Sequence, residues 1–143
     1  MRYFDSSVLV KLYHLEPNSS VAATHVRAAQ RPIILTPLHR MEVHSALRLI
    51  QGRGQITPAA CQQAIAAFSA DHANGLFRQQ SPIWPAVFAR YEQLSVAHAA
   101  TTLCRMLDTL HIALALELGA NEFCTFDHRQ AALAGLAGLT MVS

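Results

Sequence analysis

Short apolar segments alternate along this chain with longer segments that start on helix-capping signals, and this alternation restricts the possible folds more than any other feature. Thr36-Pro37 and Thr57-Pro58 each place a capping hydroxyl before a proline, which is a helix start. Strands that alternate with helices predict a mostly parallel sheet covered on both faces. We therefore expect a three-layer α/β/α fold, built as one domain over residues 1–143.

The expected elements follow from the length of each apolar run and from the residues that end it. Strands are expected at 2–4, 33–35, 76–79, 123–126 and 139–142. Helices are expected at 7–14, 19–30, 37–52, 58–72, 84–94, 96–106, 107–118 and 130–137. The segment 107–118 is apolar on almost every side, which predicts a helix buried in the middle of the fold.

Four of the nine acids occupy positions that suggest a shared site. Asp5 and Asp127 follow expected strands, Asp108 opens a late helix, and Glu42 lies on an early helix. Ligands of open parallel sheets bind outside the carboxyl ends of the strands, which places Asp5 and Asp127 on one rim. Two carboxylates about 4 Å apart repel by roughly 4 kcal/mol at an effective dielectric near 20. A hard cation such as Mg²⁺ or Mn²⁺ is the usual compensation.

Composition limits the partners and the compartment. The three cysteines show no CxxC spacing, so neither a disulfide framework nor a zinc site is indicated, and we expect a cytoplasmic protein. No segment is long enough and apolar enough for a membrane span. With 52% hydrophobic and 14% charged residues, the chain is expected to cover apolar surface with another chain. Lys11 is the only lysine among 11 basic residues, and arginine suits phosphate recognition.

The ordered set of motifs resembles the PIN domain family, and within it the VapC-type ribonuclease toxins. The resemblance covers nearly the whole chain. The matching motifs are Tyr3-Phe4-Asp5-Ser6-Ser7, Met41-Glu42-Val43, Asp108-Thr109-Leu110-His111-Ile112-Ala113 with Gly119-Ala120, and Thr125-Phe126-Asp127 with Leu133-Ala134 and Gly138-Leu139. No single motif is specific, but their order is.

This resemblance implies a function and a set of partners. It implies that the acids at Asp5, Glu42, Asp108 and Asp127 hold Mg²⁺ or Mn²⁺ and catalyse RNA hydrolysis, with Ser6 or Thr125 helping to orient the site. It also implies a homodimer and a small antitoxin. Many relatives place a further acid where this chain has Arg129, which leaves a second metal ion open. The candidates for contacts with RNA phosphates or with the partner are Arg40, Arg48, Arg53, Arg105 and Arg129, with Arg105 and Arg129 assigned to the RNA phosphates.

Other interpretations of the same residues stay open. Each aspartate taken alone is explained as a helix N-cap. His39 and His111 lie three residues from Glu42 and Asp108, the spacing of one helix face, which allows a histidine-ligated metal. The chain could also be a non-catalytic partner-binding module, or an RNA-processing nuclease without an antitoxin. An aspartyl-phosphate phosphatase is disfavoured, because Ser7 stands where that chemistry needs a second acid.

Overall fold

The computed structural model describes residues 1–142 as two compact units, each of mixed α/β structure. Unit 1 consists of Met1–Asp5 and the chain from Ser81 onward, and unit 2 of Ser6–Gln80. Each unit is described by itself. The expectation of a single domain over residues 1–143 therefore remains a prediction.

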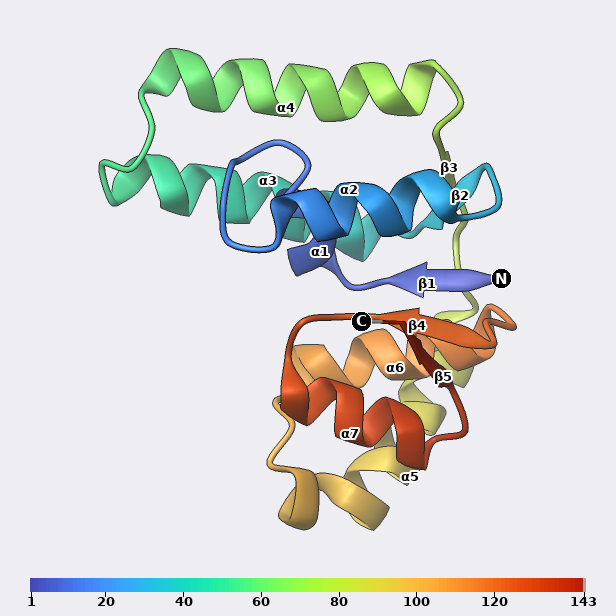
Figure 1. Cartoon of the computed structure of the whole chain (residues 1–143). Coiled ribbons are helices and arrows are strands. Elements are labelled where there is room, and N and C mark those ends of the chain that lie inside the picture. The colour runs from blue at the N-terminus through green and yellow to red at the C-terminus, as the bar shows by residue number, and fades with distance from the viewer. Residues whose placement is uncertain (143) are drawn as a thin grey trace. The chain divides into compact units, whose positions relative to one another are not determined.

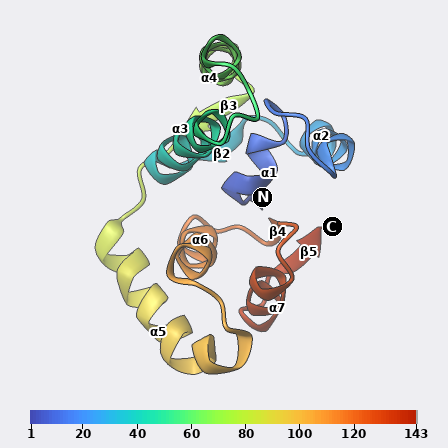
Figure 2. The same ribbon diagram turned by 90° about the vertical axis from the view of Figure 1, so that its left-hand side faces the viewer.

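Unit 1 is built on a three-stranded parallel sheet. Its strands are β1 (Arg2–Phe4), β4 (Glu122–Cys124) and β5 (Thr140–Val142), in the order β1-β4-β5. Its helices are α5 (Trp84–Thr102), α6 (Met106–Glu117) and α7 (His128–Leu136). In Figure 1 and Figure 2, α7 lies beside β4 and β5, and α5 runs along α6.

The core of unit 1 explains why α6 is apolar on almost every side. Ile112 and Leu114 on α6 are fully buried, as are Phe123 on β4 and Leu133 on α7. Tyr3 stacks on Phe123 with 5.5 Å between ring centroids, an arrangement that adds aromatic contact to buried area. Gly119, at φ 75°, ends α6 in the left-handed conformation that glycine adopts without strain.

Unit 2 carries a separate two-stranded parallel sheet and four helices. The strands are β2 (Ile33–Leu35) and β3 (Phe77–Gln79). The helices are α1 (Ser6–Val10), α2 (Ser19–Ala28), α3 (Pro37–Gly52) and α4 (Pro58–Ala73). Helices α3 and α4 lie side by side (Figure 1), and α3 also packs against α1 and β2.

The expected elements are largely confirmed, with two differences. Every strand pairing is parallel, as expected, but the five strands of the described residues form two sheets instead of one. The expected separate helix at 96–106 is wrong, because α5 continues without a break to Thr102. Alanines and other helix-tolerant residues fill this stretch, and the helix stops only where Leu103 adopts φ 54°.

Candidate active site

The carboxyl ends of β1 and β4 place two aspartates on one rim, as the sequence predicts. The two strands pair in parallel with Phe4 opposite Cys124, so the residues after each strand are neighbours. The Asp5 backbone N–H extends the ladder by donating to the Cys124 carbonyl at 3.0 Å. Asp5 follows β1 directly, and Thr125-Phe126-Asp127 follow β4. The side chain of Asp5 is almost completely buried.

Gln130 on α7 contacts all three aspartates of unit 1. Its side-chain nitrogen Nε2 donates to Asp5 Oδ1 at 3.0 Å and to the Asp108 backbone carbonyl at 3.3 Å. Its backbone N–H donates to Asp127 Oδ1 at 3.1 Å. Only 1% of Gln130 is exposed, so these bonds form away from water. One buried glutamine therefore links residues from β1, α6 and the end of β4.

Asp108 lies in the first turn of α6, but it is not the N-cap. The N-cap is Arg105, whose side chain makes no capping bond. The N-cap interpretation of Asp108 is therefore wrong, although a carboxylate in a first turn still interacts favourably with the helix dipole. The Arg105 guanidinium donates to Asp108 Oδ2 at 3.3 Å, the i,i+3 pair that the spacing allows.

Asp127 is a true helix N-cap. Its Oδ1 accepts the backbone N–H groups of Arg129 and Gln130, at 2.8 and 3.1 Å. Thr125 supports this turn, because its hydroxyl oxygen accepts the Asp127 backbone N–H at 3.1 Å. Capping and metal binding are compatible, since a carboxylate has two oxygens and about four acceptor positions. The Arg129 side chain is exposed, beside this cap.

Two thiols of unit 1 have raised pKa values, and burial is the main cause for both. Burial raises the pKa of Cys104, a hydrogen bond with Thr109 lowers it, Asp108 and Asp127 raise it, and Arg129 lowers it. Burial raises the pKa of Cys124 to about 11, with Arg2 lowering it and Asp5 raising it. Asp108, Asp127 and Arg129 therefore all lie close enough to Cys104 to affect its pKa.

His111 and Tyr3 form a buried pair beside Asp5. The Tyr3 hydroxyl and His111 Nδ1 lie 2.8 Å apart, and His111 Nε2 is 3.9 Å from Asp5 Oδ1. The second distance is too long for a hydrogen bond. If the hydroxyl donates to Nδ1, the ring proton is on Nε2 and faces the carboxylate. His111 thus packs beside the rim, and its Nδ1 is engaged by tyrosine.

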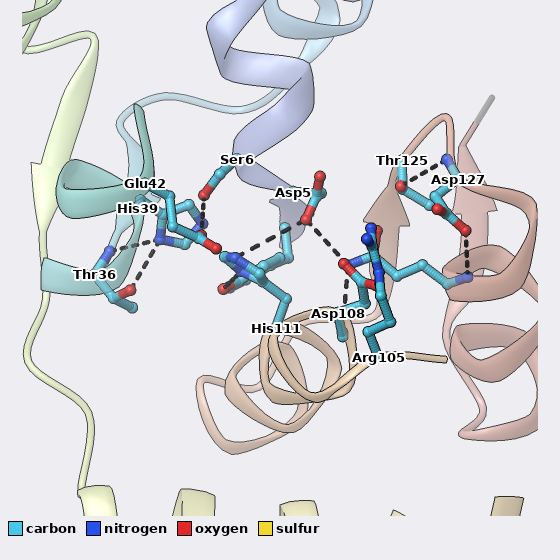
Figure 3. Close-up of polar contacts among 12 residues, drawn as sticks. Asp5, Ser6, Thr36, His39, Glu42, Arg105, Asp108, His111, Thr125 and Asp127 are labelled. Carbon is cyan, nitrogen blue, oxygen red and sulfur yellow. Dashed lines mark hydrogen bonds and ion pairs between the residues drawn. The ribbon is translucent and has the colours of Figure 1, made fainter. Parts of the chain in front are cut away.

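Glu42 lies in unit 2, on α3, with a hydroxyl partner. The Ser6 hydroxyl donates to Glu42 Oε2 at 2.7 Å (Figure 3). His39, one turn earlier, is completely buried, and its Nδ1 accepts the Thr36 backbone N–H at 3.0 Å. This nitrogen completes a capping box at the start of α3. A structural role thus accounts for His39, and the histidine-ligated metal loses support there.

The donor set fits a hard cation by chemistry, although the described residues do not form a ready cage. Residues 1–142 contain no group of three or more His, Cys, Asp or Glu side chains placed to hold a metal. Each aspartate of unit 1 instead has a donor within the protein: Gln130 for Asp5, Arg105 for Asp108, and the backbone of α7 for Asp127. The Arg105 side chain is 75% exposed, so little packing opposes its release of Asp108. Carboxylate oxygens are the ligands that Mg²⁺ and Mn²⁺ prefer.

Two site residues could not be read from motif spacing. Tyr3 was expected as part of a strand and of the first family motif, without a role in the site, and Gln130 only as part of a helix. The sequence does contain one indication that Gln130 is buried. It lies three and four residues before Leu133 and Ala134, which places it on the same helix face as these two buried residues. A polar residue on a buried face needs a partner, and here the partner is the carboxylate of Asp5.

Comparisons with known proteins identify the family of this chain and a solved structure with a similar fold. Residues 2–136 match the PIN domain family. Among solved structures, VapC20 of Mycobacterium tuberculosis, a toxin that cleaves the sarcin–ricin loop, has a similar fold. The TM-score is 0.71 at 17% identity, over 99% of this chain and 98% of that one. Curated protein sequences give no match. At this identity, the structural likeness concerns the fold.

Proposed function

Because this chain belongs to the PIN domain family, whose members are nucleases, we propose that it is an endoribonuclease that hydrolyses RNA phosphodiesters with Mg²⁺ or Mn²⁺. The observation that carries the proposal is the rim of unit 1, where one buried glutamine links Asp5, Asp108 and Asp127. Glu42 is proposed as the fourth ligand. It is hydrogen-bonded to Ser6, the residue after Asp5 in the chain.

The roles of the residues follow from their contacts. Asp5, Glu42, Asp108 and Asp127 would bind the cation, and Gln130 and Ser6 would orient two of these carboxylates. A bound cation would activate a water for in-line attack and stabilise charge on the phosphate and the leaving oxygen. Arg105 and Arg129 are exposed beside Asp108 and Asp127, where a guanidinium can bind a phosphate in bidentate geometry.

Metal dependence tests this proposal directly. RNA cleavage is expected only with added Mg²⁺ or Mn²⁺, because carboxylates and phosphate repel until a cation lies between them. EDTA should reduce cleavage to background. Binding should also be visible without RNA, since an ion at a hundred times its Kd stabilises the folded state by about 2.7 kcal/mol. Equal cleavage after EDTA treatment, with no effect of Mg²⁺ on melting, would contradict the proposed chemistry.

We further propose that this nuclease is the cytoplasmic toxin of a toxin–antitoxin pair. The similar fold of VapC20 supports this role, and the three free cysteines fit a reducing compartment. No helix within residues 1–142 is long and apolar enough to cross a bilayer. A gene for a small DNA-binding antitoxin directly upstream would support the pairing, whereas an isolated gene would favour RNA processing.

A homodimer is also proposed, from the apolar residues that unit 1 exposes. Helix α5, the residues that flank it and the first turn of α6 expose several apolar side chains. These are Ile83, Phe88, Val96, Leu103, Met106 and Leu107. Val96 is 86% exposed, which is unusual for a residue in the middle of a helix. Sedimentation is expected to find a dimer at roughly tens of micromolar and a monomer for Val96→Glu. If the wild-type chain is a monomer, the proposed homodimer is wrong, and the antitoxin would be the partner expected to cover this apolar surface.

A further inference from the structure

The face of α3 in unit 2 carries a row of three basic side chains over hollows in the surface. Arg40, His44 and Arg48 follow one another at intervals of four residues, which places them on one helix face about 6 Å apart along the axis. One hollow of about 290 Å³ is lined by Arg40, His44, His72 and Gln79, among others. A second, of about 440 Å³, shares Arg40 and His44 and adds Arg48.

The positive charge of this row is not balanced within the described residues. Arg40 and Arg48 are exposed, and neither has an ion pair among residues 1–142. His44 Nε2 is buried without a hydrogen-bond partner in this part of the chain. The row therefore presents two guanidinium groups without ion pairs, with an unsatisfied ring nitrogen between them in the sequence.

The two units differ in charge. Residues 6–80 contain seven Lys or Arg and three Asp or Glu, a formal net charge of +4. Residues 1–5 and 81–143 contain four Lys or Arg and six Asp or Glu, a net charge of −2. The aspartates that would hold the cation thus belong to the unit that repels a polyanion. An RNA substrate needs attraction from elsewhere, and unit 2 has the surplus.

We propose that the Arg40–His44–Arg48 row and its hollows bind backbone phosphates of the RNA substrate other than the phosphate that is cleaved. This inference rests on the proposed action on RNA. The two cations of the row, Arg40 and Arg48, are eight residues apart, about 12 Å along the helix axis, so they can meet two phosphates that are not adjacent in the RNA strand. The smaller hollow, about 290 Å³, is close to the lower end of the volumes of small-ligand pockets, which begin at roughly 300 Å³.

The test compares arginine substitutions in the row with a matched substitution outside it. Arg40→Gln, Arg48→Gln and the double variant are measured against Arg27→Gln, which removes one exposed charge from α2 in the same unit. The probe is a fluorescent sarcin–ricin stem-loop, and its binding is measured by anisotropy in EDTA at several salt concentrations. Cleavage of the same RNA in Mg²⁺ gives kcat and KM.

Each arginine of the row is expected to contribute about three- to tenfold in RNA affinity, and its removal should reduce the salt slope of log Kd by about 1. In the cleavage assay, the substitutions should raise KM more than they lower kcat. Arg27→Gln should have a smaller effect on both quantities. If the double variant and Arg27→Gln bind alike and share one salt slope, the row has no special role and the proposal is overturned.

Two other results separate the remaining explanations. If the double variant keeps its RNA affinity but loses binding to a polyglutamate peptide, the row takes an acidic protein segment, and the RNA assignment is wrong. If wild-type protein binds the stem-loop as expected but cleaves neither it nor total cellular RNA in Mg²⁺, the proposed chemistry fails while the phosphate site stands. Metal-dependent cleavage with unchanged RNA affinity in the double variant overturns the phosphate site alone.

Discussion

Replacing Asp108 by asparagine is expected to reduce RNA cleavage by at least about a hundredfold while raising the melting temperature in EDTA. The loss should exceed the 10- to 100-fold typical of residues that only orient a metal ligand. Asparagine keeps the size of the side chain but removes its charge. In Mg²⁺ the stability advantage should disappear, because the variant binds the ion less tightly.

The sign of the change in EDTA depends on which electrostatic effect is larger. Asparagine loses the interaction with the start of α6, worth about 0.3–1 kcal/mol, and an exposed pair with Arg105 worth about 0–1 kcal/mol. It also relieves repulsion from other carboxylates, which at an effective dielectric near 20 is roughly 4 kcal/mol at about 4 Å and falls in inverse proportion to the distance. Because Asp5 and Asp127 also carry negative charge at the rim, we expect the relief of repulsion to exceed the two losses.

Melting curves in EDTA and in Mg²⁺, together with a cleavage assay, decide the matter. Glu92→Gln is the control, since it removes one negative charge from an exposed position on α5 of the same unit. An active Asp108→Asn protein would remove Asp108 from the proposed site. An inactive variant that melts lower in EDTA would mean that Asp108 serves α6 and Arg105 rather than the metal.

The sequence predicted those parts of the rim that local patterns determine. Asp5 and Asp127 each follow a short apolar run, and parallel pairing of β1 with β4 brings such positions together. The helix start at Thr36-Pro37 was also predictable, because capping involves neighbouring residues. The participation of Glu42 in the same site stays a prediction.

Features that depend on distant residues could not be read in this way. Gln130 and Asp5 are 125 positions apart, and no spacing rule connects them. The division of the strands into two sheets depends on which strands pair, and strand length and hydrophobicity do not specify the partner. The expected break between two helices near Val96 was also wrong, because one continuous helix crosses that position.

Gln130→Leu is expected to weaken magnesium binding and RNA cleavage by about 10- to 100-fold, with little change in stability. Leucine preserves most of the side-chain volume but cannot donate to Asp5. Residues that hold a metal ligand in place typically contribute this much to affinity or activity. Without the amide, the Asp5 side chain loses a donor that fixes its orientation, and more of the binding energy of the ion is needed to order it.

Two opposing effects keep the expected change in stability small. Losing a hydrogen bond to a buried carboxylate costs about 1.5–3 kcal/mol. However, the Gln130 Oε1 atom is buried without a hydrogen-bond partner among the described residues, and leucine removes a penalty of about 1–3 kcal/mol. A residue with a purely structural role would instead lower the melting temperature and leave the magnesium dependence unchanged.

The measurement is the Mg²⁺ concentration that gives half-maximal cleavage, with melting temperatures in EDTA and in saturating Mg²⁺. Gln63→Leu, at an exposed position on α4, controls for the loss of an amide. Gln130→Glu adds a carboxylate beside Asp5, so it should melt lower than wild type in EDTA and gain more from Mg²⁺, because the ion then offsets one more negative charge. If Gln130→Leu has the wild-type magnesium requirement, and Gln130→Glu gains no more from Mg²⁺ than wild type does, Gln130 does not position Asp5 for a cation. The contact between them would then belong to the packing of α7 on β4 and β5.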